Sequence, residues 1–408
     1  MEEWKTYTLG ELSVDGKGSY GIGAPAVEYS PDKYTYLRIT DINDDGTLAA
    51  SDRKSVDAEG AENYILKEND IVFARTGNST GRAYFYDSRD GELVYAGFLI
   101  KFSLDPNKVN PKILKYYTHS KPYYDWVRSF DSGATRGNIN AQTFASMPIE
   151  LPSRTTQDRI VDIMSAIDDK IRNNNRINHN LEEQAQALYK SWFVDFEPFK
   201  GGKFVDSELG MIPEGWSVQK AEELCEINIG KTPPRKEHHW FSNNNSDVTW
   251  ISISDMGSSE VYISKSSEML TKEACKKFNV IIVPEGTVLL SFKLTVGRVS
   301  IAAKELTTNE AIARFLVPTD AMRSYLYLAL KSYDYSKLGS TSSIATAVNS
   351  KIIKKMALIC PPEDIIEKFG VHVSGIFRSI KTFQEEISCL CEQRDSLLPH
   401  LMSGEITC

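Results

Sequence analysis

Residues 160–192 read IVDIMSAIDDKIRNNNRINHNLEEQAQALYKSW, and residues 369–401 read FGVHVSGIFRSIKTFQEEISCLCEQRDSLLPHL. In both stretches mostly apolar residues recur in alternating steps of four and three. The first series is Ile160, Met164, Ile167, Ile171, Asn174, Asn178, Leu181, Ala185, Leu188 and Trp192. The second, shifted by 209, is Phe369, Val373, Ile376, Ile380, Phe383, Ile387, Leu390, Arg394, Leu397 and Leu401. A period of 3.5 residues kept over this length is typical of a coiled coil.

Prolines mark the beginning of each of these helices. Pro152 precedes the first, and Pro361 and Pro362 precede the second, because proline is tolerated in the first helical turn and not in the interior. One such series alone is equally consistent with a helix lying on its own domain. Two series in the same register favour pairing with each other. Asn174 and Asn178 interrupt the first series; a buried Asn can fix register, and partial exposure is the alternative.

The segments in front of the two helices also repeat. Trp4 matches Trp216 and Leu12 matches Leu224, both with a shift of 212 residues. Residues 36–42 match 250–256 with a shift of 214, and residues 70–73 and Gly81-Arg82 match 286–289 and Gly297-Arg298 with a shift of 216. Residues 147–149 match 356–358 with a shift of 209. A drifting shift indicates small insertions and deletions between two copies of one plan.

Each copy contains short apolar runs bounded by turn residues, and these predict strands. Examples are Asp70–Ala74, Leu99–Leu104, Val280–Val283 and Thr287–Ser291, with helical patterns at Pro111–Trp126 and Met322–Ser332. We therefore predict an α+β chain with two α/β domains, residues 1–152 and 213–361. The long helices, residues 153–197 and 362–408, follow the domains, and residues 198–212 form a linker. Antiparallel pairing of the helices as a coiled coil makes the repeat pseudo-two-fold.

The distribution of charge differs between the two copies. The whole chain has a net charge of −8, which argues at first against a nucleic-acid partner. Residues 1–150 carry 17 Lys and Arg against 22 Asp and Glu, whereas residues 213–361 carry 18 against 15. The acidity thus lies outside the second domain. This balance permits local basic loops and predicts weak non-specific affinity for nucleic acid.

Composition also indicates the cellular compartment in which the protein is expected. No stretch approaches the roughly 18 apolar residues of a membrane span, and the polar residues 1–10 lack a signal-peptide pattern. We expect a soluble, cytoplasmic protein with no membrane partner. The six cysteines form no C-x-x-C pair, so we expect reduced thiols, and the adjacent His238 and His239 are expected at the surface rather than on a metal.

Polar and basic residues gather on glycine-rich segments at equivalent places in both copies. Such side chains bind DNA phosphates and base edges, as Arg does to guanine and Asn to adenine. The predicted DNA-binding residues are Arg75, Thr76, Asn78, Ser79, Arg82, Arg136, Asn138 and Asn140 in the first domain, and Lys231, Arg235, Lys236, Lys293, Thr295, Arg298, Ser342, Ser343 and Asn349 in the second. For any one of them, an ordinary solvated turn residue is the alternative.

Two phosphate-binding patterns are incomplete. Gly230–Thr232 resembles the end of a P-loop, but the glycine that this motif requires is replaced by Cys225. Gly16–Gly21 has the glycine spacing of a dinucleotide site, but Pro25 and Pro31 follow where a helix is needed. A flexible loop is the expected structure for residues 16–21.

Two further motifs fail on chemical grounds. A spacing like that of an EF-hand loop is formed by Asp41, Asn43, Asp45, Gly46 and Asp52. Its flanks look like strands and its last ligand is Asp rather than Glu, so a hairpin turn is expected and no metal site. Residues 360–363, CPPE, lack the amide and the aromatic ring of an adenine methyltransferase motif. We therefore expect no catalytic residues in this chain.

Aromatic residues bunch where the first long helix ends. Trp192, Phe193, Phe196 and Phe199 lie within eight positions. They are predicted to contribute to binding of a partner subunit, since buried aromatic residues often anchor interfaces. A core plug between the helix and the second domain is the alternative.

Four motifs together resemble the specificity subunits of type I restriction-modification systems, and the resemblance covers essentially the whole chain. They are residues 188–198 (LYKSWFVDFEP), 209–216 (LGMIPEGW), 230–233 (GKTP) and 397–406 (LLPHLMSGEI). The resemblance implies two target-recognition domains joined by helices, which bind a bipartite, asymmetric site in double-stranded DNA. It also implies two methyltransferase subunits, and restriction and translocase subunits, as partners. The methyl donor S-adenosylmethionine is then held by the methyltransferase, so no cofactor is expected on this chain.

The helix pair suggests a spacing function. Each series spans 33 residues, or about 50 Å of helix, against about 34 Å for one DNA turn. The pair is long enough to set the distance between two half-sites. Two other classes of function remain: an enzyme that modifies DNA alone, opposed by the missing motifs, and a coiled-coil scaffold without nucleic acid, which leaves the matching loop clusters unexplained.

Overall fold

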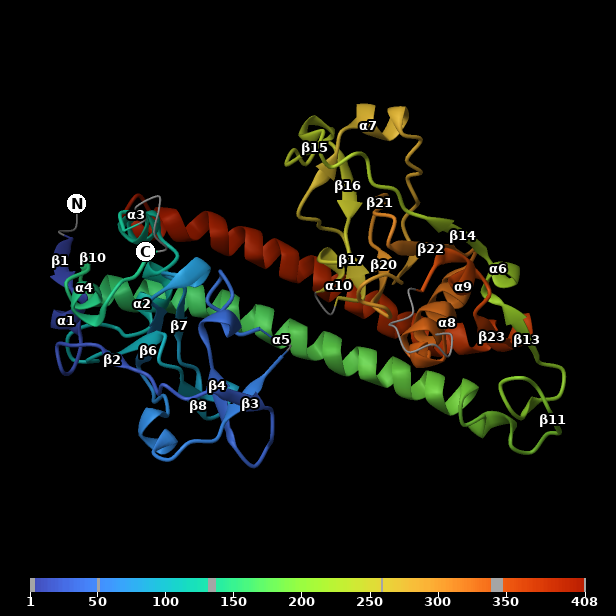
Figure 1. The fold of residues 1–408 in the computed structure, drawn as a ribbon, viewed down its shortest axis with the longest axis horizontal. Coiled ribbons are helices and arrows are strands. Elements are labelled where there is room, and N and C mark those ends of the chain that lie inside the picture. The colour runs from blue at the N-terminus through green and yellow to red at the C-terminus, as the bar shows by residue number, and fades with distance from the viewer. Residues whose placement is uncertain (1–3, 50–51, 131–136, 258–259, 339–347, 407–408) are drawn as a thin grey trace. The chain divides into compact units, whose positions relative to one another are not determined.

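Two 40-residue helices, α5 (Arg154–Phe193) and α10 (Glu363–Met402), are the longest elements of the computed structural model (Figure 1). The structure describes residues 4–49, 52–130, 137–257, 260–338 and 348–406. It divides into two compact units, and each contains part of both helices. Unit 1 consists of residues 1–170 and 390–408, and unit 2 of residues 171–389.

Unit 1 is built on two four-stranded sheets. The first has the order β2 (Ser19–Tyr20), β9 (Leu99–Ser103), β6 (Asp70–Ala74), β7 (Ala83–Phe85), with antiparallel neighbours. The second has the order β3 (Ala26–Glu28), β5 (Lys54–Val56), β4 (Tyr34–Leu37), β8 (Leu93–Tyr95), with β4 and β8 parallel. A separate pair joins β1 (Lys5–Thr8) to β10 (Pro148–Leu151). The short helices are α1 (Leu9–Leu12), α2 (Ile113–Tyr117), α3 (Lys121–Arg128) and α4 (Ala141–Ala145).

Unit 2 repeats this arrangement. Its first sheet has the order β14 (Glu226–Ile229), β22 (Ile312–Leu316), β19 (Val288–Ser291), β20 (Val299–Ala302), β17 (Tyr262–Ile263). Its second has the order β15 (Phe241–Ser242), β18 (Met269–Leu270), β16 (Val248–Ile251), β21 (Thr307–Thr308), with β16 and β21 parallel. The pairs are β13 (Ser217–Lys220) with β23 (Ala357–Cys360) and β11 (Phe204–Val205) with β12 (Ile212–Pro213). The helices are α6 (Ala221–Leu224), α7 (Lys272–Lys277), α8 (Asp320–Lys331) and α9 (Ser350–Lys354).

The two units therefore share strand order and strand direction, which confirms the internal repeat. Strand β17 extends the first sheet of unit 2, and its counterpart is absent from the described sheets of unit 1. Even a turn is duplicated. The amide of Arg38 donates to the Asp41 carboxylate at 2.8 Å after β4, and the amide of Ser252 donates to the Asp255 carboxylate at 2.8 Å after β16. In both places the aspartate lies in the short 3-10 helix that follows the strand, as the last residue of η1 (Ile39–Asp41) or the first residue of η7 (Asp255–Gly257).

Within unit 2, α5 and α10 run antiparallel. Asn174 of α5 is fully buried, and its Nδ2 donates to Glu386 of α10 at 2.8 Å. Further along α5, the ring of Phe193 packs on Phe369, with centroids 4.8 Å apart. Residue numbers thus rise along α5 as they fall along α10, as the coiled-coil prediction requires. Every position of both predicted apolar series is buried or half-buried.

The helices also meet in unit 1, around Asp168. Its carboxylate accepts from Lys115 at 2.5 Å and Tyr116 at 3.1 Å, both on α2, and lies 3.6 Å from the guanidinium of Arg394 on α10. This explains the one charged residue in the second apolar series, because Arg394 has a half-buried partner there. Ile160 and Leu401 belong to the same core.

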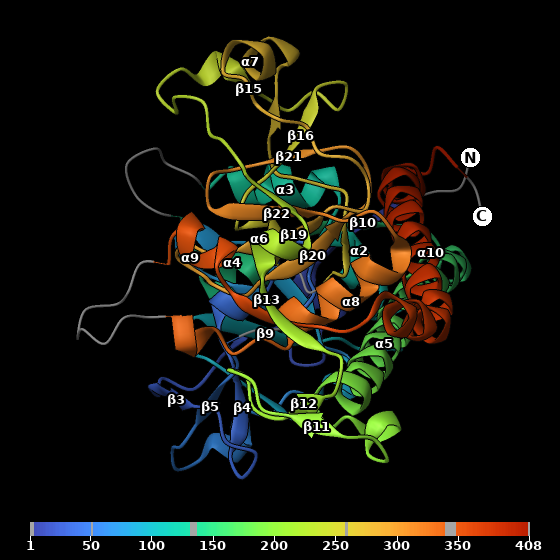
Figure 2. The same ribbon diagram turned by 90° about the vertical axis from the view of Figure 1, so that its right-hand side faces the viewer.

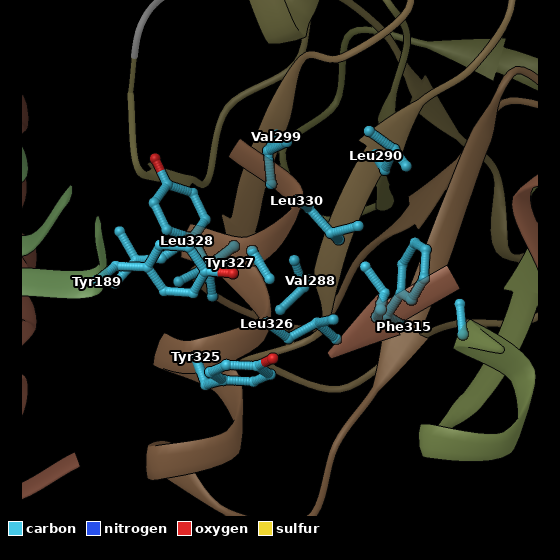
Figure 3. Close-up of a cluster of buried hydrophobic side chains, with 14 of the residues drawn as sticks. Tyr189, Val288, Leu290, Val299, Phe315, Tyr325, Leu326, Tyr327, Leu328 and Leu330 are labelled. Atoms are coloured by element: carbon cyan, nitrogen blue, oxygen red, sulfur yellow. The ribbon is translucent and has the colours of Figure 1, made fainter. Parts of the chain in front are cut away.

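The core of unit 2 surrounds α8, which packs against β19 and β20 (Figure 2). Residues 324–330 of this helix are all buried, as expected for a helix that is apolar around its whole circumference. Figure 3 shows Tyr325, Leu326, Tyr327, Leu328 and Leu330 of α8 with Tyr189 of α5 and Val288, Leu290, Val299 and Phe315 of the sheet.

Several predicted elements differ from those observed. The helical pattern of Pro111–Trp126 is split into α2 and α3, because Ser120 is extended and Pro122 lacks the amide needed to continue a helix. Val280–Val283 is not a strand; only Val283 forms a bridge, with Leu306. Residues 16–21 were expected to be a flexible loop, but Ser19 and Tyr20 form β2 against β9. Helix α10 continues through Pro399, three residues before its end. Proline lacks the amide that would donate to the carbonyl of residue 395, and less than one turn of the helix follows it.

Candidate nucleic-acid interface

The loop between β6 and β7 in unit 1 is held by a small set of backbone hydrogen bonds. Ala74 donates to the carbonyl of Arg82 at 2.8 Å, and Gly81 donates to the carbonyl of Ala74 at 2.9 Å. Arg75 then donates to the carbonyl of Phe98 at 3.1 Å. These bonds close the hairpin and leave residues 75–80 as its tip.

The structure brings the two predicted clusters of unit 1 together at this tip. Thr76 forms a β-bridge with Asn138, and the Arg75 Nη2 donates to the Asn138 side chain at 3.3 Å. Thr80 donates through its hydroxyl to the carbonyl of Gly137 at 3.0 Å. Asn78 is exposed, whereas Ser79 is buried at 8% exposure, so Ser79 is not presented to a ligand.

The same backbone bonds frame the loop between β19 and β20 in unit 2. Ser291 donates to the carbonyl of Arg298 at 2.9 Å, and Gly297 donates to the carbonyl of Ser291 at 3.0 Å. Phe292 donates to the carbonyl of Ala311 at 2.9 Å, as Arg75 does to Phe98. The predicted residues Lys293 and Thr295 are both exposed at this tip. The two loops are therefore structural equivalents with different side chains.

Two of the predicted arginines are engaged in holding neighbouring turns. The Arg82 guanidinium contacts Asp44 at 2.6 Å and donates to the carbonyl of Ile42 at 3.1 Å. In unit 2 the guanidinium of Arg298 donates to the carbonyl of Ile253 at 2.7 Å. Both carbonyls belong to the turn that follows the strand β4 or β16. These contacts tie each loop to the neighbouring turn, and DNA binding by Arg82 and Arg298 stays a prediction.

Two of the predicted asparagines cap short helices. The Asn140 Oδ1 accepts from the amide of Thr143 at 2.9 Å at the start of α4. The Asn349 Oδ1 accepts from the amides of Lys351 at 3.0 Å and Ile352 at 3.1 Å at the start of α9. Helices α4 and α9 are equivalent, so the cap is part of the repeated plan. Arg136, Ser342 and Ser343 lie outside the described residues.

The remaining basic cluster of unit 2 lies on the segment after β14. The Lys231 Nζ donates to the carbonyl of Phe278 at 2.5 Å. The Arg235 guanidinium contacts Glu268 at 2.6 Å and lies over the ring of Trp250, 4.6 Å from its centroid. Lys236 is exposed. The P-loop-like amides are occupied as well, since Lys231 donates its amide to the carbonyl of Thr308 at 2.8 Å.

The calcium-like spacing in unit 1 is a turn, as expected. Asn43 donates to the carbonyl of Thr47 at 2.9 Å, which closes the hairpin. The carboxylate of Asp52 is taken up by Lys54 and Arg38, and hydrogen bonds from Lys54 and then Arg38 lower its pKa. Asp41 pairs with Arg38 at 2.6 Å. Carboxylates neutralised in this way do not converge on a cation.

Three exposed apolar or aromatic residues next to the loops were not predicted. Tyr20 lies under the Arg75 guanidinium, 5.1 Å from its ring centroid, and is 42% exposed. Phe98, beside Arg75, is 59% exposed, and Leu294 in the unit 2 loop is 99% exposed. For Phe98 and Leu294 the signal in the sequence is an apolar residue at a turn between two strands, where no core requires it.

The four aromatic residues at the end of α5 pack among themselves and around Trp216. Phe193 is fully buried, with its ring centroid 5.8 Å from that of Trp216, and Phe199 lies 4.9 Å from the same ring. This is the core plug given above as the alternative. Phe193 has no exposed surface for a partner subunit. Partner binding by the half-buried Trp192, Phe196 and Phe199 stays a prediction.

The described residues were also compared with the requirements of a metal site, a reactive thiol and a membrane-spanning helix. No group of three or more His, Cys, Asp or Glu side chains is placed to hold a metal ion among those residues. Cys225, Cys275 and Cys360 are free thiols, and burial raises the pKa of Cys225 to about 12, which disfavours the nucleophilic thiolate. The helices of the described part include none that is long and apolar enough to cross a membrane.

Comparison with known proteins places these observations in a family. Residues 1–183 and 213–387 match the model of the type I restriction modification DNA specificity domain. The HindI specificity subunit of Haemophilus influenzae is 26% identical over 474 residues, covering 100% of both chains. The MjaIX specificity subunit of Methanocaldococcus jannaschii is 27% identical over 305 residues, 72% of this chain and 68% of that protein.

A solved structure supports the fold. The S subunit of a type I restriction-modification system from M. genitalium superposes with a TM-score of 0.55, covering 98% of this chain and 96% of that chain at 14% identity. Specificity subunits are the DNA-recognition components of type I systems and not their catalytic components. The family model covers both copies of the repeat, so this chain belongs to the family of type I restriction-modification specificity subunits.

Proposed function

We propose that this chain recognises a bipartite, asymmetric site in double-stranded DNA, one half with each unit, and directs adenine methylation or cleavage by partner subunits. One observation carries the proposal: the two units share strand order and loop frame but present different side chains at the loop tips. A repeated scaffold supplies the same docking geometry twice. Different tips then select different bases, so the two half-sites are unlike.

The tip of unit 1 supports direct base recognition. Arg75 donates to Asn138 through Nη2 alone among the described contacts, and its Nε is buried, so the donors left for a base lie on the two Nη nitrogens. Its Cζ lies over the ring of Tyr20, 5.1 Å from the centroid, which adds a second contact to the guanidinium. An arginine oriented in this way matches the O6 and N7 acceptors of guanine in the major groove. Exposed Asn78 beside it offers both a donor and an acceptor.

The continuous helices support a fixed spacing between the half-sites. Helix α5 contributes residues 154–170 to unit 1 and 171–193 to unit 2 without interruption, and α10 returns through both. We assign base recognition to residues 1–152 and 213–361 and spacing to the helix pair. Polar contacts such as Asn174 with Glu386 fix the register in which the helices pair.

Partners supply the chemistry in this proposal. Two methyltransferase subunits bind the chain and hold S-adenosylmethionine, and restriction and translocase subunits join them for cleavage. The relatives with full-length similarity are components of type I restriction enzymes. The partly exposed rings of Trp192, Phe196 and Phe199 at the end of α5 are our candidates for a contact with one methyltransferase.

The test is a methylation map. The chain is expressed with the methyltransferase subunit of its own system, and methylated adenines are mapped across the host genome. The expected result is one split sequence with two unlike halves, absent when either protein is omitted. Methylation by this chain alone would identify it as an enzyme. A contiguous or palindromic site would contradict recognition of one half by each unit.

A further inference from the structure

Leu294 occupies the tip of the β19–β20 loop in an unusual state. Its side chain is 99% exposed, and its backbone is left-handed, with φ of 60°. The amide of Thr295 donates to the carbonyl of Lys293 at 2.6 Å, which closes a three-residue γ-turn around Leu294. A γ-turn with positive φ is rare and strained for a residue with a branched side chain.

The equivalent position in unit 1 makes the choice of leucine informative. Counted from Arg75 and Phe292, which occupy the same place in the two frames, Gly77 corresponds to Leu294, and the loop of unit 2 is one residue shorter before its closing Gly297. Gly77 is left-handed too, with φ of 77°. Glycine adopts this conformation without a steric cost. Unit 2 has a large apolar side chain at a position of positive φ, where glycine would carry no steric strain, and the fold of unit 2 gains no burial from it.

The turn is built to hold this side chain outward. Phe292, two residues earlier, is 1% exposed and anchors the loop in the core. The Ser291 hydroxyl donates to the carbonyl of Thr295 at 2.6 Å and accepts from the amide of Arg298 at 3.0 Å. The base of the loop is therefore rigid. Only Lys293, Leu294 and Thr295 project from it, a cation and a hydroxyl on either side of one apolar group.

We propose that Leu294 inserts between adjacent base pairs of the half-site bound by unit 2. The inference rests on the proposed function. Apolar wedges such as leucine partly unstack a base step and kink the duplex, and sites that deform easily are then preferred. The Lys293 ammonium is placed next to the wedge to bind a flanking phosphate. Recognition by unit 2 thereby includes the deformability of a base step, in addition to base edges.

The experiment uses the complete complex with its methyltransferase and duplexes that carry 2-aminopurine at successive positions of the mapped half-site. The wild-type complex should raise the fluorescence at one step, because the base is unstacked there. Leu294→Asn should abolish that rise and weaken binding of the specific duplex by roughly tenfold, an effect comparable to one mismatched base pair. Asparagine tolerates the left-handed turn, so the loop is retained.

Two further variants separate insertion from general effects. Leu294→Met keeps a long apolar side chain and should retain most of the fluorescence rise. Ile281→Ala removes another exposed apolar side chain of unit 2, 51% exposed and outside this loop, and should change nothing. Equal binding and fluorescence of Leu294→Asn and wild type would overturn the insertion.

An apolar contact with a thymine methyl group is the competing outcome. In that case the wild-type complex would bind a duplex with uracil in place of one thymine as weakly as Leu294→Asn binds the unmodified duplex. The wild-type complex would also give no rise in 2-aminopurine fluorescence, and insertion would be wrong. A wild-type complex without preference for any duplex would overturn both the proposed function and the insertion. Specific binding without unstacking would overturn the insertion alone.

Discussion

The β6–β7 loop of unit 1 and the β19–β20 loop of unit 2 start and end with the same hydrogen bonds but carry different chemistry. In unit 1 the residue that pairs with the neighbouring turn is Arg75, and the left-handed position is Gly77. In unit 2 these positions hold Phe292, which is buried, and Leu294, which is exposed. The frame is thus a constant of the fold, and the tip is free to vary. Under the proposed function, this separation would let one fold serve two half-sites.

The comparison predicts its largest effect for an exchange of a whole domain. Replacing residues 1–150 by the first domain of another family member should change one half of the methylated sequence completely and leave the other half and the spacer intact. The reason is that each tip belongs to the frame of its own unit. Genome-wide mapping of methylated adenines measures the outcome. A change in both halves would show that the units do not read independently.

A matched insertion in both helices tests the part of the molecule that the units share. Seven residues added between Lys170 and Ile171, and seven between Cys389 and Leu390, keep Asp168 opposite Arg394 and Asn174 opposite Glu386. One heptad adds about 10 Å of helix. The preferred spacer should lengthen, by at most about 3 base pairs at 3.4 Å each.

Insertion into α5 alone is the control for that experiment. It shifts one apolar series against the other and should abolish methylation or expose the helices to protease. An unchanged spacer in the doubly extended protein would refute a spacing role for the helices. Loss of function in both variants, with intact folding, would have the same consequence.

The long helices and the strands of the two units also differ in how well the sequence predicts them. The apolar series of α5 and α10 predicted both helices, because a coiled-coil seam depends only on local periodicity. The charged Arg394 is accommodated in the second series because it pairs with Asp168 of α5, which also accepts from Tyr116 of α2. The spacing of apolar residues alone does not reveal this contact. Asp70–Ala74 was predicted at its observed bounds, whereas β2 was missed because its glycine-rich sequence has no strand pattern.

The loop residues were harder to interpret from sequence. Arg82, Arg298, Asn140 and Asn349 have the side chains of DNA-binding residues, yet each makes a contact that maintains its own turn or helix. Polar residues at turns serve backbone groups and ligands with the same atoms, so residue type alone does not separate the two uses. Leu294 was not among the predicted residues for the opposite reason, since polar and basic side chains are the ones expected at a loop predicted to bind DNA.

A smaller effect is expected for a single residue at the tip of unit 1. Arg75→Ala should lower specific methylation by roughly 10–100-fold, the range for loss of one bidentate base contact, and relax the preference at one position of one half-site. Lys121→Ala is the control, because it removes an equally positive side chain that is 85% exposed on α3. A uniform loss of affinity for specific and random duplexes would instead identify Arg75 as a phosphate contact.

The smallest effects are expected at the helix caps, where stability and recognition can be separated. Asn140→Ala removes the acceptor of the Thr143 amide and should cost about 1 kcal/mol at the start of α4, so that this amide exchanges with solvent about fivefold faster. Asn140→Ser keeps a capping oxygen and loses the carboxamide that pairs with adenine. If capping is the only role, the serine variant retains both the protection and the methylated sequence. A serine variant with normal protection and a relaxed sequence preference would assign Asn140 to base recognition as well.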